Sequence, residues 1–394
     1  MKRIGFSGSL DPITNGHMWV IGEARQLADE VIVFISENPF KHCHFTAAQR
    51  EKIVIASCHE RAWYNVKVVV VKGDYTARAA KHHGVDYLIR GIRNNADFDY
   101  ENLLQQANVE VIDGAKTLFV MPPRDLGSVS STFVRGLQGP VGWHWHMKKF
   151  VPRPAYQAWI EDWLHREWAH LWPDSPERAT DRAANDERAS QSPRHMFLQK
   201  ILSAYSGPRR YYHDLEHLVH GLSELKVYAA NHSIAAHDLR VLQLAFWFHD
   251  FIYRGEQNES DEEASAQAWL AAQLDPTCAE EVAQLIRATE HSKQVREQSP
   301  LAKVLIGADL AILGQSHEIY TNYAQAVRRE YQYVNDDLFW IGRQRVLCAM
   351  LQKAETGILF EDAYFADLYQ AQSCDNLRWE IEECQAKMAM QTTV

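Results

Sequence analysis

No run of apolar residues in this sequence is long enough to cross a bilayer, and the first residues enter an expected strand without the apolar core or cleavage site of a secretory signal. The six cysteines form no CxxC pair and no dense framework, so we expect reduced thiols in a cytoplasmic protein that does not bind membranes. There are 41 Lys and Arg against 51 Asp and Glu, a net charge of −10, which argues against nonspecific binding of nucleic acid. A phosphorylated ligand is compatible with this charge, because it needs only a local basic cluster.

A chain of 394 residues is too long for one ordinary domain, and its 46% hydrophobic and 23% charged residues are typical of globular proteins. Strand and helix patterns alternate over residues 1–135, where apolar runs such as Val31–Ile35 and Val66–Val71 indicate strands buried on both faces. This alternation predicts an α/β fold with a doubly wound parallel sheet. Because such sheets bind ligands beyond the carboxyl ends of their strands, residues that follow strand ends are site candidates.

The first candidate stretch, Phe6–His17, joins an expected strand to an expected helix through a Gly-containing turn. A helix N-terminus offers free backbone N–H groups and a positive dipole end, which together suit a phosphate. Thr14 and His17 place a hydroxyl and an imidazole at the start of the helix, and Gly16 leaves room for a ligand against the backbone. A βα turn without a ligand is the alternative, since a single glycine motif is a weak signal.

Further candidates follow later strands. Lys41 comes after a Pro-containing loop, where an ordinary solvated lysine is the alternative. Arg90 and Arg93 flank Gly91 after the expected strand Tyr87–Ile89, and two arginines at a strand end favour an anion clamp. Hydroxyl side chains then begin an expected helix, either as plain helix caps or as donors to phosphate. These are Ser130, Ser131 and Thr132.

These blocks resemble the T/HxGH signature and accompanying motifs of the nucleotidylyltransferase superfamily. The run GSLDPITNGH is most similar to the phosphopantetheine adenylyltransferase family, over roughly residues 1–152. The resemblance implies transfer of an adenylyl group from ATP to 4′-phosphopantetheine, giving dephospho-coenzyme A and pyrophosphate, with Mg²⁺ neutralising the leaving pyrophosphate. It also implies a homohexamer, although an appended domain can change that state.

By the same resemblance, three residues are catalytic: His17 and Lys41 stabilise the pentacovalent phosphorus, and Arg90 positions the acceptor together with Ser9. The acceptor phosphate is already a nucleophile, so no covalent intermediate and no strong general base are needed. The other residues assigned to binding of ATP or acceptor are Leu10, Thr76, Gly91, Arg93, Glu101, Ser130, Ser131 and Thr132.

The sequence departs from the family pattern in three places. Leu126-Gly127-Ser128 stands where an aromatic residue followed by Ser and Phe is usual, and Ser9-Leu10 stands where Thr or Ser followed by Phe is frequent. Thr76 occupies a position that often carries an apolar residue beside the pantetheine arm. The alternative function is therefore nucleotidyl transfer to another phosphorylated acceptor.

The pattern changes again after about residue 139. Six of the twelve Trp lie between Trp143 and Trp172, and Ala155–Leu171 is expected to form an amphipathic helix that packs against a neighbouring domain or subunit. The charged, Ala- and Ser-rich segment 173–193 indicates a linker or a solvated helix. The expected organisation is a first domain over 1–152, the Trp-rich helix and linker over 153–193, and a second domain over 194–394.

The second domain shows amphipathic helical patterns and almost no strand pattern, which predicts an all-α fold. His213 and His217 are four residues apart and are expected on one face of a helix. His249-Asp250 and Asp309 place charges in or beside apolar runs, where burial is costly unless they are paired, and a divalent metal removes that cost. For any one of these histidines taken alone, an ordinary surface or core residue is the alternative to a metal ligand. The expected helices are Leu215–Ala230, Ala236–Phe251, Asp261–Leu274, Ala279–Glu290, His317–Val334 and Phe339–Ala354.

The segments YYHDLEH, WFHD and GADLAILG together resemble the HD superfamily of metal-dependent phosphohydrolases, over about Arg210–Arg378. The resemblance implies hydrolysis of a phosphorylated small molecule or nucleotide at a divalent transition metal or Mg²⁺. It assigns proton donation to the leaving group to His213, with a role as metal ligand as the close alternative, and it assigns His291 to substrate phosphate or a second metal. The implied metal ligands are His217, His249, Asp250 and Asp309.

Two functions of different classes therefore apply to the second domain. It is either a phosphohydrolase or a sensor that binds a nucleotide and a metal without turnover and regulates the first domain. The presence of His213 beside a complete ligand set favours hydrolysis.

Overall fold

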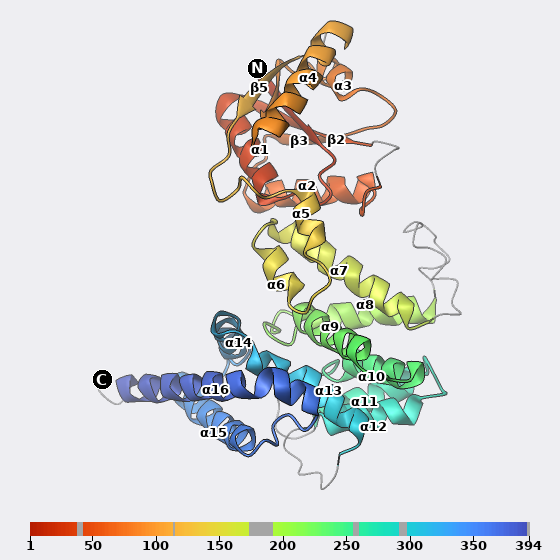
Figure 1. The fold of residues 1–394 in the computed structure, drawn as a ribbon, viewed down its shortest axis with the longest axis vertical. Helices are drawn as coiled ribbons and strands as arrows, with labels where there is room; N and C mark the ends of the chain where they lie inside the picture. The colour runs from red at the N-terminus through yellow and green to blue at the C-terminus, as the bar shows by residue number, and fades with distance from the viewer. Residues whose placement is uncertain (38–41, 113–114, 173–191, 255–259, 291–297, 392–394) are drawn as a thin grey trace. The chain divides into compact units, whose positions relative to one another are not determined.

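The computed structural model describes residues 1–37, 42–112, 115–172, 192–254, 260–290 and 298–391 (Figure 1). It contains two compact units, Met1–Ile160 and Glu161–Val394. The boundary between the units falls within helix α7 (Arg153–His170), and the domain limits expected at residues 152 and 194 stay predictions. Within the described ranges, no helix combines the length and the apolar character needed to span a membrane.

The N-terminal unit is built on a five-stranded sheet in which every neighbouring pair of strands is parallel. The strand order is β3-β2-β1-β4-β5, so the winding reverses between β1 and β4, and this reversal creates the switch point at which such sheets bind ligands. The expected doubly wound α/β fold is confirmed. The strands are β1 (Arg3–Gly8), β2 (Glu30–Ser36), β3 (Val66–Val71), β4 (Tyr87–Gly91) and β5 (Lys116–Val120).

Helices cover both faces of this sheet (Figure 1). On one face, Ala80 of α3 belongs to a buried cluster with Phe34 and Leu88. On the opposite face, α1 packs so closely that a Cβ added at Gly91 would lie 2.9 Å from Val20 Cγ2. The helices are α1 (Asn15–Leu27), α2 (Ala47–Glu60), α3 (Thr76–His82), α4 (Asn95–Ile112), α5 (Ser131–Gly136) and α6 (Trp143–Lys148).

The described residues of the C-terminal unit form helices and no strand, as the sequence predicted. Helices α8, α13 and α16 were not among those expected. Two of them carry a start signal, since a capping serine precedes proline at Ser192-Pro193 and at Ser299-Pro300. The elements are α8 (Pro193–Tyr205), α9 (Leu215–Asn231), α10 (Ala236–Phe248), α11 (Asp261–Ala272), α12 (Ala279–Ala288), α13 (Pro300–Leu310), the 3₁₀ turn η3 (Ala311–Gly314), α14 (His317–Glu330), α15 (Asp336–Glu355) and α16 (Ala363–Gln391).

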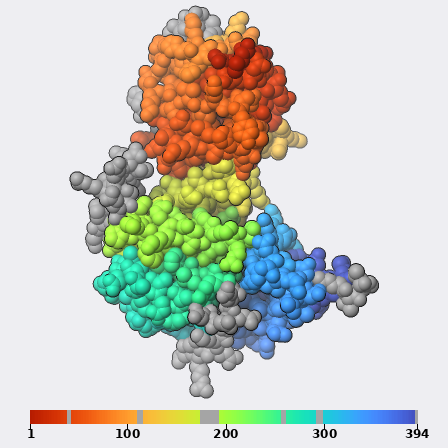
Figure 2. Space-filling view, turned by 180° about the vertical axis from the view of Figure 1, so that it is seen from behind, coloured from red at the N-terminus to blue at the C-terminus, as the bar shows by residue number. Residues whose placement is uncertain are grey.

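Helices α9 and α10 approach one another unusually closely. A Cβ added at Gly221 would lie only 1.8 Å from Phe246 Cζ, so glycine is required at this crossing. The apolar end of α10 is fully buried, including Trp247 and Phe248. Figure 2 shows the green and teal segments, which include α8 and α10–α12, packed against each other on the face in view. The close crossing brings the start of α9 next to the end of α10, where the predicted metal ligands lie.

Candidate functional sites

Helix α1 begins directly after the turn that follows β1. The Thr14 hydroxyl caps it by accepting the His17 backbone N–H, while the Thr14 backbone N–H donates to His17 Nδ1 at 3.0 Å. Because Nδ1 accepts this bond, the ring proton of the neutral imidazole lies on Nε2. His17 is thus arranged to donate a hydrogen bond from Nε2 without carrying a charge.

Two arginines lie at and just beyond the end of β4, and each is held by an acidic side chain of α4. Arg90 donates to the Ser7 carbonyl of β1, and its Nε lies 3.2 Å from Glu101 Oε2. Arg93 Nε lies 2.8 Å from Asp97 Oδ2. The two guanidinium groups are partly exposed, so an incoming phosphate can compete for them at the switch point between β1 and β4.

The start of α5 completes this edge of the sheet. The Ser130 hydroxyl caps α5 by accepting the Phe133 N–H at 3.1 Å, and the Ser131 hydroxyl donates to the Pro12 carbonyl at 2.8 Å. Arg93 Nη1 lies 3.5 Å from the Val129 carbonyl. The structure therefore brings together the turn after β1, the end of β4 and the beginning of α5, which supply most of the predicted residues.

The remaining predicted residues lie around this edge. Ser9 and Leu10 follow β1 directly, and Leu10 is buried with a φ of 48°. Thr76 begins α3, and its hydroxyl lies 3.1 Å from that of Ser36 at the end of β2. Gly91 packs closely against α1. Thr132 Oγ1 accepts a hydrogen bond from Arg135, one helical turn later. Lys41 lies outside the described residues.

Asp11 was absent from the sequence-based candidates, although it lies in the same turn. Its carboxylate is fully buried and accepts the backbone N–H groups of His44 at 2.7 Å and Phe45 at 2.9 Å. Arg135 Nη1 lies 3.8 Å away as counterion. Asp11 therefore holds the backbone of His44 and Phe45, which follow Lys41 in the sequence. The Asp-Pro pair within the turn was the available signal.

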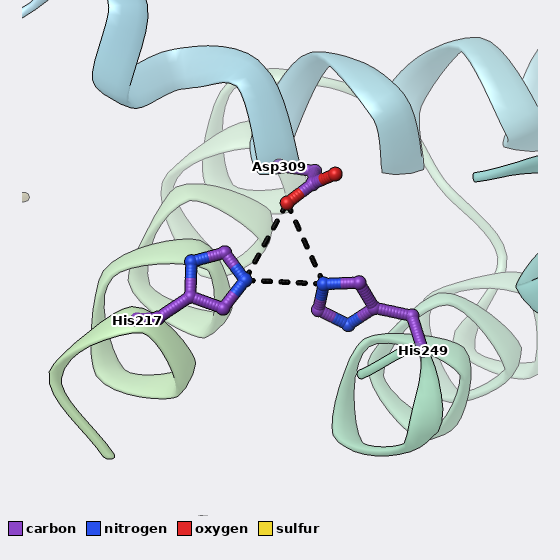
Figure 3. A group of neighbouring side chains, drawn as sticks. All are labelled: His217, His249 and Asp309. Carbon is purple, nitrogen blue, oxygen red and sulfur yellow. Dashed lines mark hydrogen bonds and ion pairs between the residues drawn. The ribbon is translucent and has the colours of Figure 1, made fainter. Parts of the chain in front are cut away.

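In the C-terminal unit, three helix ends converge on one point (Figure 3). His217 lies in the first turn of α9, His249 follows α10, and Asp309 lies in the last turn of α13. The two Nε2 atoms are 3.1 Å apart, and Asp309 Oδ1 lies 3.4 Å from that of His217 and 3.5 Å from that of His249. The three ligand atoms all lie within 4.8 Å of one another, a spacing that could hold one metal ion.

Asp250 adds a second carboxylate to this group. Its Oδ2 lies 3.2 Å from His249 Nε2 and 3.6 Å from His217 Nε2. His249 Nδ1 faces the Phe246 carbonyl at 2.8 Å, a partner that fixes the ring and leaves Nε2 to bind a cation. The residues present thus fit a divalent metal held by imidazole and carboxylate, and the four predicted ligands are the ones brought together.

Burial and two carboxylates together set the pKa values of the histidines in this group. Burial lowers the pKa of His217 to about 3, so this imidazole is neutral. Burial also opposes protonation of His249, but the carboxylates of Asp250 and Asp309 outweigh it and raise its pKa well above the ordinary value. A proton on His249 then offsets one of the two carboxylate charges. Metal binding would displace that proton.

His213 is held beside the group by a carboxylate from α14. Its Nδ1 lies 2.7 Å from Glu330 Oε2, and its Nε2 lies 3.9 Å from Asp250 Oδ2. Glu330 Oε1 also accepts three successive backbone N–H groups, those of Tyr211, Tyr212 and His213, at 2.8 to 2.9 Å. The predicted proton donor therefore has one nitrogen bound by a buried carboxylate and the other directed toward the metal group.

The expectation that His213 and His217 share a helical face is wrong. Asp214 caps α9 by accepting the N–H groups of Glu216 and His217, so His213 precedes the helix. Its ring still lies 5.7 Å from that of His217, because Glu330 draws the preceding backbone inward. His291 lies outside the described residues.

Two further residues of this site were not predicted. Arg210 donates to the His213 carbonyl at 2.9 Å and to the Asp250 carbonyl at 2.7 Å, so it ties the two histidine-containing segments together. Glu330 lies 117 residues from its partner His213 and stands outside every motif used. In the sequence, Glu330 is only one acidic residue within the expected helix His317–Val334.

Comparison with known proteins identifies the first unit. Residues 6–137 match a family model described as cytidylyltransferase-like, so this unit is a cytidylyltransferase-like domain. A phosphopantetheine adenylyltransferase of Chromobacterium violaceum is 38% identical over 160 residues, which are 41% of this chain and 96% of that protein. The enzyme of Neisseria meningitidis (serogroup C) is 34% identical over 164 residues, which are 42% of this chain and 95% of that protein. The enzyme of Cytophaga hutchinsonii is 39% identical over 140 residues, which are 35% of this chain and 90% of that protein. Through its N-terminal part, the chain belongs to the phosphopantetheine adenylyltransferase family.

Proposed function

We propose that the N-terminal unit transfers an adenylyl group from ATP to 4′-phosphopantetheine and releases dephospho-coenzyme A and pyrophosphate. The observation that carries this proposal is the likeness to phosphopantetheine adenylyltransferases over nearly their whole length. The described geometry supports it, because a neutral His17 and two partly exposed arginines lie around the end of β1 and β4. A homohexamer stays a prediction for this unit.

In this proposal, His17 Nε2–H donates to an oxygen of the α-phosphate as charge develops in the transition state. Arg90 orients the acceptor phosphate and Arg93 the ATP phosphates, after exchanging their contacts with Glu101 and Asp97. Lys41 is assigned to the transferring phosphate from the family resemblance alone. Bound Mg²⁺ would neutralise the leaving pyrophosphate.

The test is chromatographic detection of dephospho-coenzyme A from ATP, 4′-phosphopantetheine and Mg²⁺. His17→Ala should lower the rate about 100- to 1,000-fold, as expected for one donor to a developing oxyanion. The control is His59→Ala, an exposed histidine of α2. If the wild type forms no dephospho-coenzyme A but adenylylates another phosphorylated acceptor, the alternative function is supported. That alternative was inferred from the departures at Leu126-Gly127-Ser128 and Thr76.

We propose that the C-terminal unit is a metal-dependent phosphohydrolase of the HD type. The convergence of His217, His249 and Asp309, with Asp250 beside them, carries this proposal. A bound divalent metal would lower the pKa of a coordinated water and polarise the phosphoryl oxygen. His213 protonates the leaving-group oxygen from Nε2, and Glu330 holds its ring in place.

The competing function is a sensor that binds nucleotide and metal without turnover. Release of inorganic phosphate from a panel of phosphate esters, with Mg²⁺, Mn²⁺ or Ni²⁺, distinguishes the two. Hydrolysis by the wild type that is lost in Asp250→Ala, but not in the exposed control Asp337→Ala, supports the enzyme. Ligand binding without release of phosphate by any of the three proteins supports the sensor. Disappearance of dephospho-coenzyme A in the wild type only would show that the two units share a pathway.

A further inference from the structure

A pocket of the C-terminal unit is lined by Glu330 and Tyr253, two residues that contact His213. Its lining is unusually rich in two residue types, with guanidinium groups from Arg209, Arg210 and Arg254 and phenol rings that include Tyr253 and Tyr331. We call it the arginine–tyrosine pocket. Glu330, the carboxylate that binds His213, also belongs to its lining.

The pocket adjoins the proposed hydrolase site, because two of its lining residues, Tyr253 and Glu330, contact His213. The Tyr253 ring lies 4.4 Å from the His213 ring, and its hydroxyl donates to Glu330 Oε2 at 3.3 Å. The two nitrogens of His213 therefore face two different places: Nδ1 faces Glu330 of the pocket, and Nε2 faces Asp250 of the metal group. A leaving group protonated at Nε2 would reach the pocket by passing along His213 and Tyr253.

The charge of the pocket is positive. Its carboxylate, Glu330, is already engaged by three backbone N–H groups and by His213. Arg210 donates to backbone carbonyls, and no carboxylate partner for it or for Arg209 occurs among the described residues. Arg254 is paired with Asp261 at 3.0 Å. This local excess of cations, in a chain with a net charge of −10, is suited to an anion.

We propose that the arginine–tyrosine pocket binds a second phosphate group of the substrate, carried by the leaving half of the molecule. The substrate class is then an organic bisphosphate. An anhydride is disfavoured, because its second phosphate would lie at His213 Nε2 itself, whereas the pocket lies beyond the imidazole ring. This inference rests on the proposed hydrolase function and adds to it the class of substrate.

The reaction is a hydrolysis with water as the second reactant. An oxygen of water forms a bond to the scissile phosphorus, and the bond from phosphorus to the alcohol oxygen breaks. The proton on His213 Nε2 passes to that oxygen. The products are inorganic phosphate and an alcohol that keeps its second phosphate in the pocket, so the guanidinium groups retain their ligand throughout the step.

The experiment uses the full chain with Mn²⁺ and substrates without an adenine ring, so that the N-terminal unit does not select among them. Phosphate release is measured from α,ω-alkanediol bisphosphates of three to six carbons, from n-butyl phosphate and from pyrophosphate. The test variant is Arg209→Ala, and the matched control is Arg345→Ala, another exposed arginine, on α15. Arg210 is unsuitable because it holds the backbone of the site.

The wild type and Arg345→Ala should hydrolyse at least one bisphosphate about 10- to 100-fold more efficiently, in kcat/KM, than butyl phosphate or pyrophosphate, as expected for one charged phosphate contact. Arg209→Ala should remove most of that preference by raising KM, with butyl phosphate unaffected. Equal use of mono- and bisphosphates by the wild type, or an equal loss on both in Arg209→Ala, would overturn the proposal.

Calorimetry separates a failure of the pocket from a failure of the hydrolase. If no compound is hydrolysed, the hydrolase function fails for this class, and binding of butanediol bisphosphate to the Mn²⁺-treated protein decides the role of the pocket. Binding that is at least tenfold weaker in Arg209→Ala than in Arg345→Ala supports a phosphate site. Absent or equal binding rejects it.

Discussion

Glu330→Gln tests how the proposed proton donor is held. The Glu330 side chain is only 1% exposed and binds three backbone N–H groups and His213 Nδ1. Burial opposes ionisation, but the charge and hydrogen bond of His213 and the backbone N–H groups outweigh it and lower the pKa from 4.5 to about 2. A shift of this size corresponds to about 3 kcal/mol of stability.

The sign of the pH dependence follows from this shift. The folded pKa lies below the ordinary value, so the stabilisation is complete above pH 4.5 and is lost as the pH falls from 4.5 towards 2. Glu330→Gln should therefore cost about 2–3 kcal/mol at pH 7, since glutamine keeps one acceptor oxygen but loses the charge. The cost should shrink progressively below pH 4.5.

The assay is hydrogen exchange with mass spectrometry over residues 205–217 at several urea concentrations, which follows this loop even where the two units unfold separately. Glu355→Gln is the control, because Glu355 is an exposed partner of Arg378 and should contribute less than about 0.5 kcal/mol. The reasoning is refuted if residues 205–217 of Glu330→Gln exchange as slowly as those of the wild type at pH 7. It is also refuted if the stability lost in Glu330→Gln, relative to the wild type, is as large at pH 3 as at pH 7.

Three further predictions concern residues in or beside the two candidate sites, one in the N-terminal unit and two in the C-terminal unit. Asp11→Ala leaves the buried Phe45 N–H and the partly buried His44 N–H without their acceptor. It should destabilise the N-terminal unit by about 2–4 kcal/mol, seen as a lower Tm in calorimetry. Gly221→Ala drives a methyl group into Phe246 and should cost at least 2 kcal/mol, whereas Gly342→Ala, which has open space around it, should be neutral or slightly stabilising. Mn²⁺ at 100 times its Kd should stabilise the wild type by about 2.7 kcal/mol and His249→Ala much less, and equal Tm shifts in both proteins would contradict the metal site.

The sheet was predictable because buried parallel strands such as β2 (Glu30–Ser36) are continuous apolar runs bounded by polar turns. The cap at Ser130 was equally visible, since the serine stands directly before a helical pattern. The ends of helices were less predictable. The expected helix beginning at Ala236 stops at Phe248, because the following His249-Asp250 pair turns toward the metal group rather than continuing the apolar face.

The candidate sites were predictable only where local spacing determines them. His217, His249, Asp250 and Asp309 each stand in a recognisable segment, and the structure places them together. The position of His213 was predicted wrongly, because helical periodicity does not show that Asp214 caps the helix. Glu330 was missed, since its partnership with His213 depends on how α14 packs against the loop before α9, a long-range contact that no local pattern encodes.

The place of Glu330 in the chain has a consequence for synthesis. The proposed metal ligands are all translated by Asp309, but the carboxylate that arranges residues 211–213 comes only at the last residue of α14. A ribosome-bound chain therefore contains every proposed ligand before it contains the residue that arranges its proton donor. We expect a nascent chain that ends before Glu330 to release no phosphate from phosphate esters, so that chemistry begins only when the helical unit is nearly complete.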